Sequence, residues 1–196
     1  MAQIARIAPT ARRAAVIIGA LVAILALSAC GLEHRKNHNT VGDAENMYVN
    51  AGPLTYQVQL TRQLNPYATE DTQYLAGLSS PQTIPATKLW FAVFLWAKNQ
   101  SGHPQTTSDR FEIVDSSGTT YQPVTLNPTL NPYAWTQQTL QPDGTEPAPD
   151  TTAADGPTQG GLILFKLDNS IYSNRPLTLE IFAPGQAKPT TVSLDL

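Results

Sequence analysis

Few residues in this sequence have the type and spacing needed for chemistry, and the most distinctive is its single cysteine, Cys30. Because one cysteine cannot form an intramolecular disulfide, its thiol is either idle or a modification site. It directly follows the small residues Ser28 and Ala29, which end an uncharged apolar run. Small side chains fit a peptidase cleft, so we expect cleavage between Ala29 and Cys30 and acylation of the thiol.

The residues before Cys30 have the order of an export signal. Residues 1–13 contain three arginines and no acid, and the seventeen residues 14–30 contain no charge. A basic segment followed by an apolar one is typical of a secretory signal, and a bilayer-spanning helix needs a longer apolar run of about 20 residues. The phrase Leu27–Cys30 resembles the lipobox of bacterial lipoproteins. An uncleaved membrane anchor is the weaker alternative, so we expect residues 1–29 to be a lipoprotein signal peptide.

The expected lipid predicts where the mature protein resides. Two acyl chains are sufficient for stable anchoring, so we expect the protein at the extracytoplasmic face of the cell membrane. The pair Arg12-Arg13 invites a twin-arginine interpretation, but no further consensus surrounds it. General secretion is therefore the plainer export route.

The three histidines offer little for catalysis or metal binding. His34 and His38 are four residues apart, a spacing that would place two metal ligands on one helix face, but the polar segment around them does not support a helix. His103 could act as a general base if a serine and an aspartate converged on it. No nucleophile phrase G-x-S-x-G occurs, so we expect a surface histidine.

Acidic residues gather in one Pro/Gly-rich segment, where Asp143, Glu146, Asp150 and Asp155 could supply oxygens to calcium. Their spacing does not match a D-x-D-x-D-G loop, so a solvated loop is favoured. Two further carboxylate pairs have odd separations, which place the partners on opposite sides of a strand and make them poor glycosidase pairs: Glu112 with Asp115, and Glu70 with Asp71. We therefore predict no catalytic residue, no metal, no cofactor and no enzymatic activity.

Aromatic residues in the expected loops are the best candidates for a binding surface. Large rigid rings dominate interface energetics and could receive a sugar ring, peptidoglycan or a protein partner. The same rings could instead pin long loops onto the body of the domain, and we prefer that interpretation of the individual residues. The four residues in question are Tyr67, Tyr74, Tyr133 and Trp135.

The elements that must position these residues are mostly strands. Short apolar or alternating runs bounded by Gly, Pro, Asn or Ser predict strands near Leu54–Thr61, Leu89–Asn99, Phe111–Asp115, Thr119–Val124, Gly161–Leu167, Leu177–Phe182 and Thr190–Leu194. The run Leu89–Ala97 is apolar on both faces and predicts a central strand with Trp90 and Trp96 on one side. Asp115–Gly118 predicts a tight hairpin, and a helical turn is expected between Thr69 and Leu78.

This pattern predicts an all-β fold, an immunoglobulin-like β-sandwich of about seven strands with two long Pro-rich loops, after an N-terminal signal helix and a flexible tether. The loops cover residues 65–87 and 127–159. We expect the lipidated cysteine and tether over residues 30–46 and the sandwich over residues 47–196. Once the three arginines of the signal peptide are removed, the mature chain has nine Lys and Arg and 15 Asp and Glu. Its formal charge of −6 argues against nucleic-acid binding.

The assembled pattern resembles the DUF4352-like immunoglobulin-like lipoproteins of Gram-positive and actinobacterial cells. The resemblance covers about residues 52–182 and rests on the hydrophobic spacing and on the phrase F-x-I-V-D-x-x-G-x-x-Y at residues 111–121. It implies a sandwich module of mostly undefined role, with no catalytic residue to carry over.

Together these features predict a membrane-anchored extracytoplasmic lipoprotein that acts as a binding or interaction module at the cell envelope. Its expected partners are the membrane, through the lipid, and an envelope protein or glycan. A cell-envelope hydrolase and a calcium-binding accessory domain are the alternatives.

Overall fold

The computed structural model describes residues 38–79 and 82–195. The predicted signal helix, the lipidation site at Cys30 and the first part of the expected tether lie outside the described residues.

Among the described helices, none has the length and apolar character needed to cross a bilayer.

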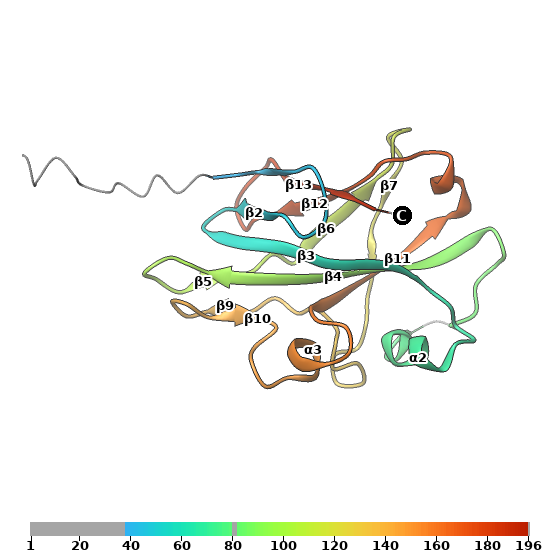
Figure 1. Cartoon of the computed structure of the whole chain (residues 1–196), viewed down its shortest axis with the longest axis horizontal. Coiled ribbons are helices and arrows are strands. Elements are labelled where there is room, and N and C mark those ends of the chain that lie inside the picture. Colours follow the sequence, from blue (N-terminus) through green and yellow to red (C-terminus); the bar gives the residue numbers. More distant parts are fainter. Residues whose placement is uncertain (1–37, 80–81, 196) are drawn as a thin grey trace, which may run out of the picture. The chain divides into compact units, whose positions relative to one another are not determined.

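Two β-sheets face each other across an apolar core, which confirms the all-β sandwich (Figure 1). The first sheet has the order β1-β13-β12-β6-β7, with strands at Val41–Gly42, Thr190–Leu194, Leu177–Phe182, Arg110–Val114 and Thr120–Tyr121. The second has the order β2-β3-β4-β11-β8, with β10 also paired to β4, and its strands are Tyr48–Ala51, Leu54–Leu64, Lys88–Asn99, Gly161–Asp168, Pro123–Val124 and Thr145–Glu146. A separate two-stranded ribbon joins β5 (Gln105–Thr106) to β9 (Thr139–Leu140).

The central strand β4 is apolar on both faces because each face contacts a different core. Alternate side chains point to opposite sides of a strand, so Phe91, Val93 and Leu95 enter the core between the sheets. Trp90 and Phe94 point the other way, into a second core on the outer face of the second sheet. This explains the unbroken apolar run and places both tryptophans of β4 on one side, as expected from the sequence.

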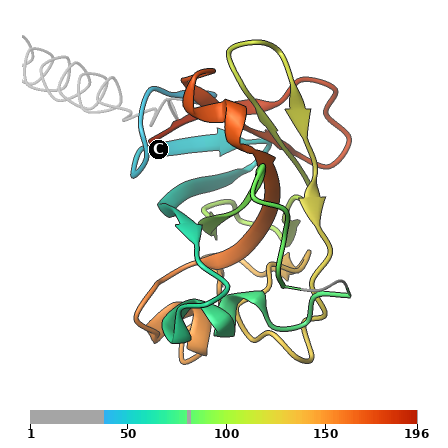
Figure 2. The same cartoon turned by 90° about the vertical axis from the view of Figure 1, so that its right-hand side faces the viewer.

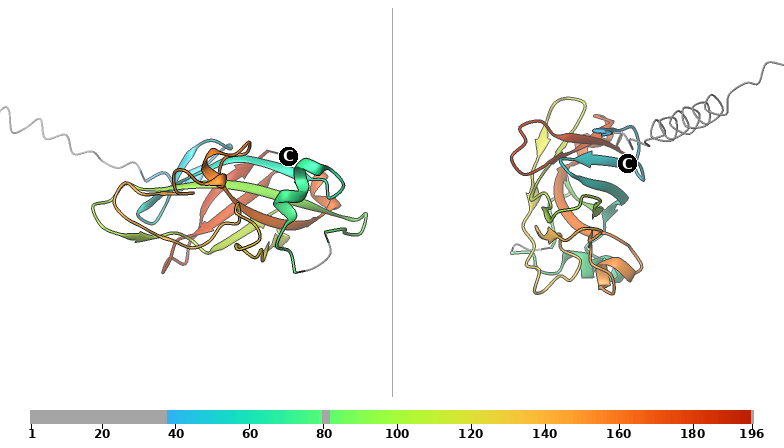
Figure 3. Two further views of the ribbon diagram at one scale, coloured as in Figure 1. Left: turned by 90° about the horizontal axis from the view of Figure 1, so that it is seen from below. Right: turned by 90° about the vertical axis from the view of Figure 1, so that its left-hand side faces the viewer.

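The two long loops build the cover of the second core. The first loop contains α2 (Thr69–Thr72) and a 3-10 turn at Gln73–Leu75, and the second contains α3 (Thr152–Asp155). Figures 2 and 3 show α2 and α3 on the side of the second sheet that faces away from the first sheet. Another 3-10 turn, at Asn169–Tyr172, follows β11. The sandwich therefore has a third, mostly irregular layer on one side.

The expected strand Thr119–Val124 is in fact two strands in different sheets. Thr120–Tyr121 pairs with β6 in the first sheet, and Pro123–Val124 pairs with β11 in the second. Proline has no N–H to donate to a ladder and is therefore found at strand starts and sheet edges. Pro123 begins β8 at the edge of the second sheet, where the chain crosses from one sheet to the other.

The folded part begins earlier than the sequence suggested. Val41–Gly42 pairs in parallel with β13, and the Glu45 carboxylate accepts hydrogen bonds from the backbone N–H groups of Thr61 and Asp195 at 3.3 and 3.0 Å. Residues expected to form the end of the tether thus belong to the sandwich. A two-residue strand held by backbone bonds leaves no hydrophobic periodicity, so the sequence pattern could not indicate it.

Candidate functional site

The four aromatic residues expected to form a binding surface do not share one. Tyr74 and Tyr133 are buried, at 2% and 4% exposure, and their rings meet edge to face at 4.8 Å. The Tyr74 hydroxyl hydrogen-bonds Thr158 Oγ1 at 2.9 Å, and the Tyr133 hydroxyl hydrogen-bonds Gln73 Oε1 at 3.1 Å. These bonds join the two long loops to each other, and both rings pack in the second core on the second sheet.

Trp135 and Tyr67 lie in different surroundings from that pair. The Trp135 ring is partly buried at the edge of the main core, 5.7 Å from the Phe111 ring, and its Nε1 donates to the Ser108 carbonyl at 2.9 Å. Tyr67 is 82% exposed. The four residues therefore do not form one aromatic platform, because Tyr74 and Tyr133 are buried and hold the loops, as the preferred interpretation of the sequence expected.

The candidate catalytic and metal-binding groups are dispersed. Over residues 38–79 and 82–195, no three His, Cys, Asp or Glu side chains come close enough to hold a metal ion. His103 is exposed, and its carbonyl accepts from Asn99 Nδ2 at 2.8 Å and from Ser101 Oγ at 2.9 Å. Asp143, Asp150 and Asp155 are exposed, whereas Glu146 is half-buried.

The carboxylates outside the second loop have structural partners. Asp115 accepts from the Ser117 hydroxyl at 2.6 Å and from the backbone N–H of Thr119 at 3.0 Å, which closes the predicted hairpin. The Ser117 hydrogen bond holds the pKa of the Asp115 carboxyl below its usual value. Glu112 pairs with Arg110 at 2.9 Å, and Asp71 pairs with Arg62. Glu70 is exposed at the surface.

Glu146 is the one carboxyl in the second loop with an unusual environment. Its burial raises the pKa to about 7, because a carboxylate loses hydration when it leaves water. The residue pairs with Ala97 of β4 through β10 and is followed by a cis peptide bond to Pro147. Glu146 therefore changes its charge near neutral pH.

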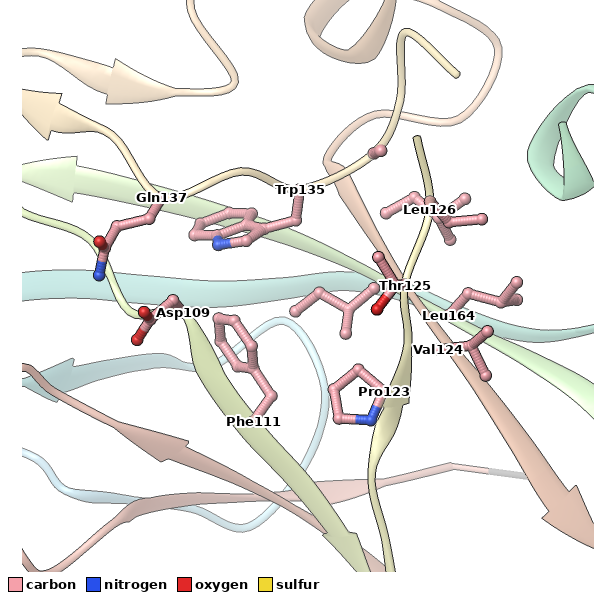
Figure 4. Close-up of a pocket in the computed structure, with 12 residues that line it drawn as sticks. Asp109, Phe111, Pro123, Val124, Thr125, Leu126, Trp135, Gln137 and Leu164 are labelled. Carbon is pink, nitrogen blue, oxygen red and sulfur yellow. The ribbon is translucent and has the colours of Figure 1, made fainter. Parts of the chain in front are cut away.

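A pocket of about 310 Å³ opens between the two sheets at the edge where β6 and β8 lie (Figure 4). We call it the inter-sheet pocket. It has an apolar end and a polar end, and its lining residues are Asp109, Phe111, Pro123, Val124, Thr125, Leu126, Ala134, Trp135, Gln137, Leu162, Ile163 and Leu164. Figure 4 shows Asp109 and Gln137 at one end, with Val124, Leu126 and Leu164 toward the other.

The polar end of the inter-sheet pocket presents acceptors. Gln137 Nε2 already donates to the Thr107 carbonyl at 3.1 Å, and Trp135 Nε1 is held by Ser108. The amide oxygen of Gln137 and the exposed carboxylate of Asp109 remain at this end. Such an arrangement suits a ligand that has a hydrogen-bond-donating or cationic head and an apolar body. Sequence analysis found Trp135 but missed Asp109 and Gln137, because neither belongs to a motif and only folding brings them together.

No known family model and no curated protein matches the chain. Among solved structures, the yjhA protein of Bacillus subtilis is 12% identical, with a TM-score of 0.49 over 78% of this chain and 99% of that one. An uncharacterised β-sandwich protein of Clostridium difficile is 12% identical, with a TM-score of 0.42 over 78% and 93% of the two chains. A conserved hypothetical protein of Bacillus anthracis is 9% identical, with a TM-score of 0.44 over 76% and 94%. The two packed sheets of the chain themselves make it a β-sandwich protein.

Proposed function

We propose that this chain is a lipid-anchored extracytoplasmic protein of the DUF4352-like type, whose sandwich binds a small amphiphilic ligand in the inter-sheet pocket. The anchor rests on the sequence before Cys30, where a basic segment, an apolar run and two small residues precede the only thiol. The binding role rests on the pocket, which combines apolar walls with the exposed Asp109 carboxylate and the Gln137 amide at one end.

The inter-sheet pocket is the observation that carries the binding role. Phe111 and Trp135 supply two large rings at its wall, and the exposed lining as a whole is mixed, slightly more polar than apolar. Ligand sites use a few placed polar groups to orient a molecule whose apolar part packs on such rings. The Asp109 carboxylate adds a negative charge at the polar end. A bound molecule would place an ammonium or similar donor at Asp109 and an apolar tail toward Leu126.

A matched pair of soluble ligands tests this assignment. We expect 4-phenylbutylamine to bind the full chain in calorimetric titration and 4-phenylbutyrate, which has the opposite charge, to bind at least ten-fold more weakly. Asp109→Asn removes the charge without removing the side chain and should weaken amine binding about ten-fold. Equal binding of both ligands, or no effect of Asp109→Asn, would exclude this pocket as the site.

The anchor has a separate test. We expect the intact mass of the membrane-extracted protein to match cleavage before Cys30 plus a diacylglyceryl group, and the Cys30→Ala variant to lose that adduct. An uncleaved and unmodified chain would contradict the lipoprotein assignment without affecting the pocket.

A further inference from the structure

A second concave surface lies on the outer face of the second sheet, away from the inter-sheet pocket. It is a groove of about 300 Å³ whose floor is formed by β2, β3 and β4 and whose rim is formed by the second long loop. The residues that matter most are Tyr48, Gln57, Gln59 and Trp96 on the strands, with Pro147 and Gln159 on the rim. We call it the outer-face groove.

The register of the strands explains why these side chains meet. Gln57 of β3 lies opposite Tyr48 of β2 on one side and opposite Trp96 of β4 on the other. Directly opposed residues in an antiparallel sheet point to the same face. Tyr48, Gln57 and Trp96 therefore form one row across three strands, on the face away from the main core.

The aromatic members of this row are open to solvent. Tyr48 is 59% exposed and Trp96 is partly buried, and their ring centroids are 6.1 Å apart with an interplanar angle of 67°. Two rings at such an angle form a corner with one apolar wall on each side. A saturated ring with an apolar C–H face can pack against either wall, and aromatic side chains commonly combine apolar contact with polar surroundings.

The amides of the row are held in place before any ligand arrives. Gln59 Nε2 donates to Gln57 Oε1 at 2.6 Å, and Gln57 Nε2 donates to the Asn46 carbonyl at 2.6 Å. In this chain of hydrogen bonds the side-chain oxygen of Gln59 can still accept a hydrogen bond from a ligand. The exposed Gln159 adds another side-chain amide at the rim of the groove. A pre-ordered amide costs less side-chain entropy when it binds a hydroxyl group.

The charge of the groove restricts the ligand. None of its ten lining residues, all within the described part of the chain, has a charged side chain at neutral pH. A ligand with a buried ionic group would find no counter-charge there. The best match is a neutral molecule that has many hydroxyl groups and an apolar ring face.

We propose that the outer-face groove is a binding site for a neutral polysaccharide, in which a sugar ring packs in the corner of Tyr48 and Trp96 and its hydroxyls bond the glutamine amides. The two ring walls and the side-chain amides of this face favour a glycan. Tyr48 lies on β2, an edge strand of the second sheet, so a peptide that adds to that edge is the competing occupant that the test must separate. This site is independent of the inter-sheet pocket.

Affinity electrophoresis of the full chain in detergent tests the proposal, with gels that contain mannan, arabinogalactan or anionic hyaluronan. We expect retardation by at least one of the two neutral polysaccharides and none by hyaluronan. Tyr48→Ala should weaken the binding about ten-fold, and Tyr48→Phe, which keeps the ring, should weaken it less. The matched control is Tyr67→Ala, which removes an exposed tyrosine distant from the groove in sequence and outside its lining.

Three results would overturn the proposal. The first is that neither neutral polysaccharide retards the chain. The second is that the Tyr48→Ala variant and the parent chain are retarded equally. The third is that the groove binds a proline-rich peptide and no polysaccharide. Amine binding by the inter-sheet pocket would be unaffected by any of these results, so failure here and failure of the pocket assignment are separate.

Discussion

The outer face of the second sheet is divided into two halves that share strand β4 but differ in their cover. In the closed half, Trp90 is 1% exposed and donates its Nε1 hydrogen to the Gln82 carbonyl at 2.5 Å. In the open half, Trp96 lies on the same face of the same strand, is only partly buried, and lines a groove. Residue type is the same in both halves, so the path of the long loops decides which ring is structural and which is available to a ligand.

The largest expected difference between the halves is in stability. Phe94→Ala removes a ring that is fully buried in the closed half and meets Tyr74 edge to face at 5.1 Å. Truncation of a buried phenylalanine costs about 3–5 kcal/mol. Urea unfolding should show this loss, and a loss below about 1 kcal/mol would mean that the loops do not close this half in solution.

The link between the two long loops should give the next largest effect. Asn131 is fully buried, and its Nδ2 donates to the carbonyls of Tyr74 and Ala76 at 3.0 and 3.1 Å. Asn131→Ala leaves those buried groups unpaired, which we expect to cost about 2–3 kcal/mol in urea unfolding.

A second asparagine provides the control for this link. Asn127 is exposed, and its side-chain oxygen accepts a local hydrogen bond from the Thr129 N–H at 3.0 Å; its backbone bonds do not depend on the side chain. Asn127→Ala should cost less than about 1 kcal/mol. Similar losses in the two variants would show that Asn131 does not join the loops.

The raised pKa of Glu146, on the loop that forms the rim of the open half, predicts that the free energy of unfolding depends on pH. Burial raises its pKa from about 4.5 to about 7, so the folded protein binds a proton more tightly than the unfolded chain. The contribution of this group to the free energy of unfolding has its full value below about pH 4.5 and is lost as the pH rises through about 7. Glu146→Gln should remove this slope and stabilise the fold at pH 8 by on the order of 1 kcal/mol after allowance for solvent screening.

Urea unfolding at pH 4, 6 and 8 measures the Glu146 effect. The parent and the Glu146→Gln variant should differ most at pH 8 and least at pH 4. A constant difference across this range would show that the carboxyl does not titrate there.

The smallest stability effect is expected in the open half itself. Tyr48→Ala removes a ring that is more than half exposed and has one edge contact, with Trp96. We expect a loss of about 0.5 kcal/mol in urea unfolding. A loss comparable with that of Phe94→Ala would make Tyr48 part of the core and remove the contrast between the halves.

Much of the sandwich could be predicted from the sequence, because long strands with one or two buried faces leave a clear pattern. The strands at Leu177–Phe182 and Thr190–Leu194 begin and end at the predicted residues. Strand β2 was not predicted, since Tyr48–Ala51 has only four residues and a single turn separates it from β3. Strand β8 was predicted as the end of one continuous strand, Thr119–Val124, because the alternation continues across the crossover between the sheets.

The candidate sites were much less predictable. The sequence pointed to aromatic residues in the loops, and folding buried Tyr74 and Tyr133 under hydrogen bonds that no local pattern encodes. The row of the open half left one usable signal, the alternation of Gln57 and Gln59 with apolar Tyr56 and Val58. That alternation predicts a polar strand face, but cross-strand register alone brings Trp96 beside it.

The early start of the folded part has a mechanical consequence. A pull on the chain at His38 would reach β1 first, where Val41–Gly42 pairs with β13 over only two residues. The Asn50 N–H to Asn39 carbonyl bond at 2.6 Å and the Glu45 bonds to Thr61 and Asp195 are the other contacts that hold this segment. Loss of all these contacts would free the residues from His38 to Met47, whose fully extended length is roughly 30 Å at about 3.3 Å per residue. A pull at this end would therefore detach the edge strand β1 before it loads the longer ladders of either sheet.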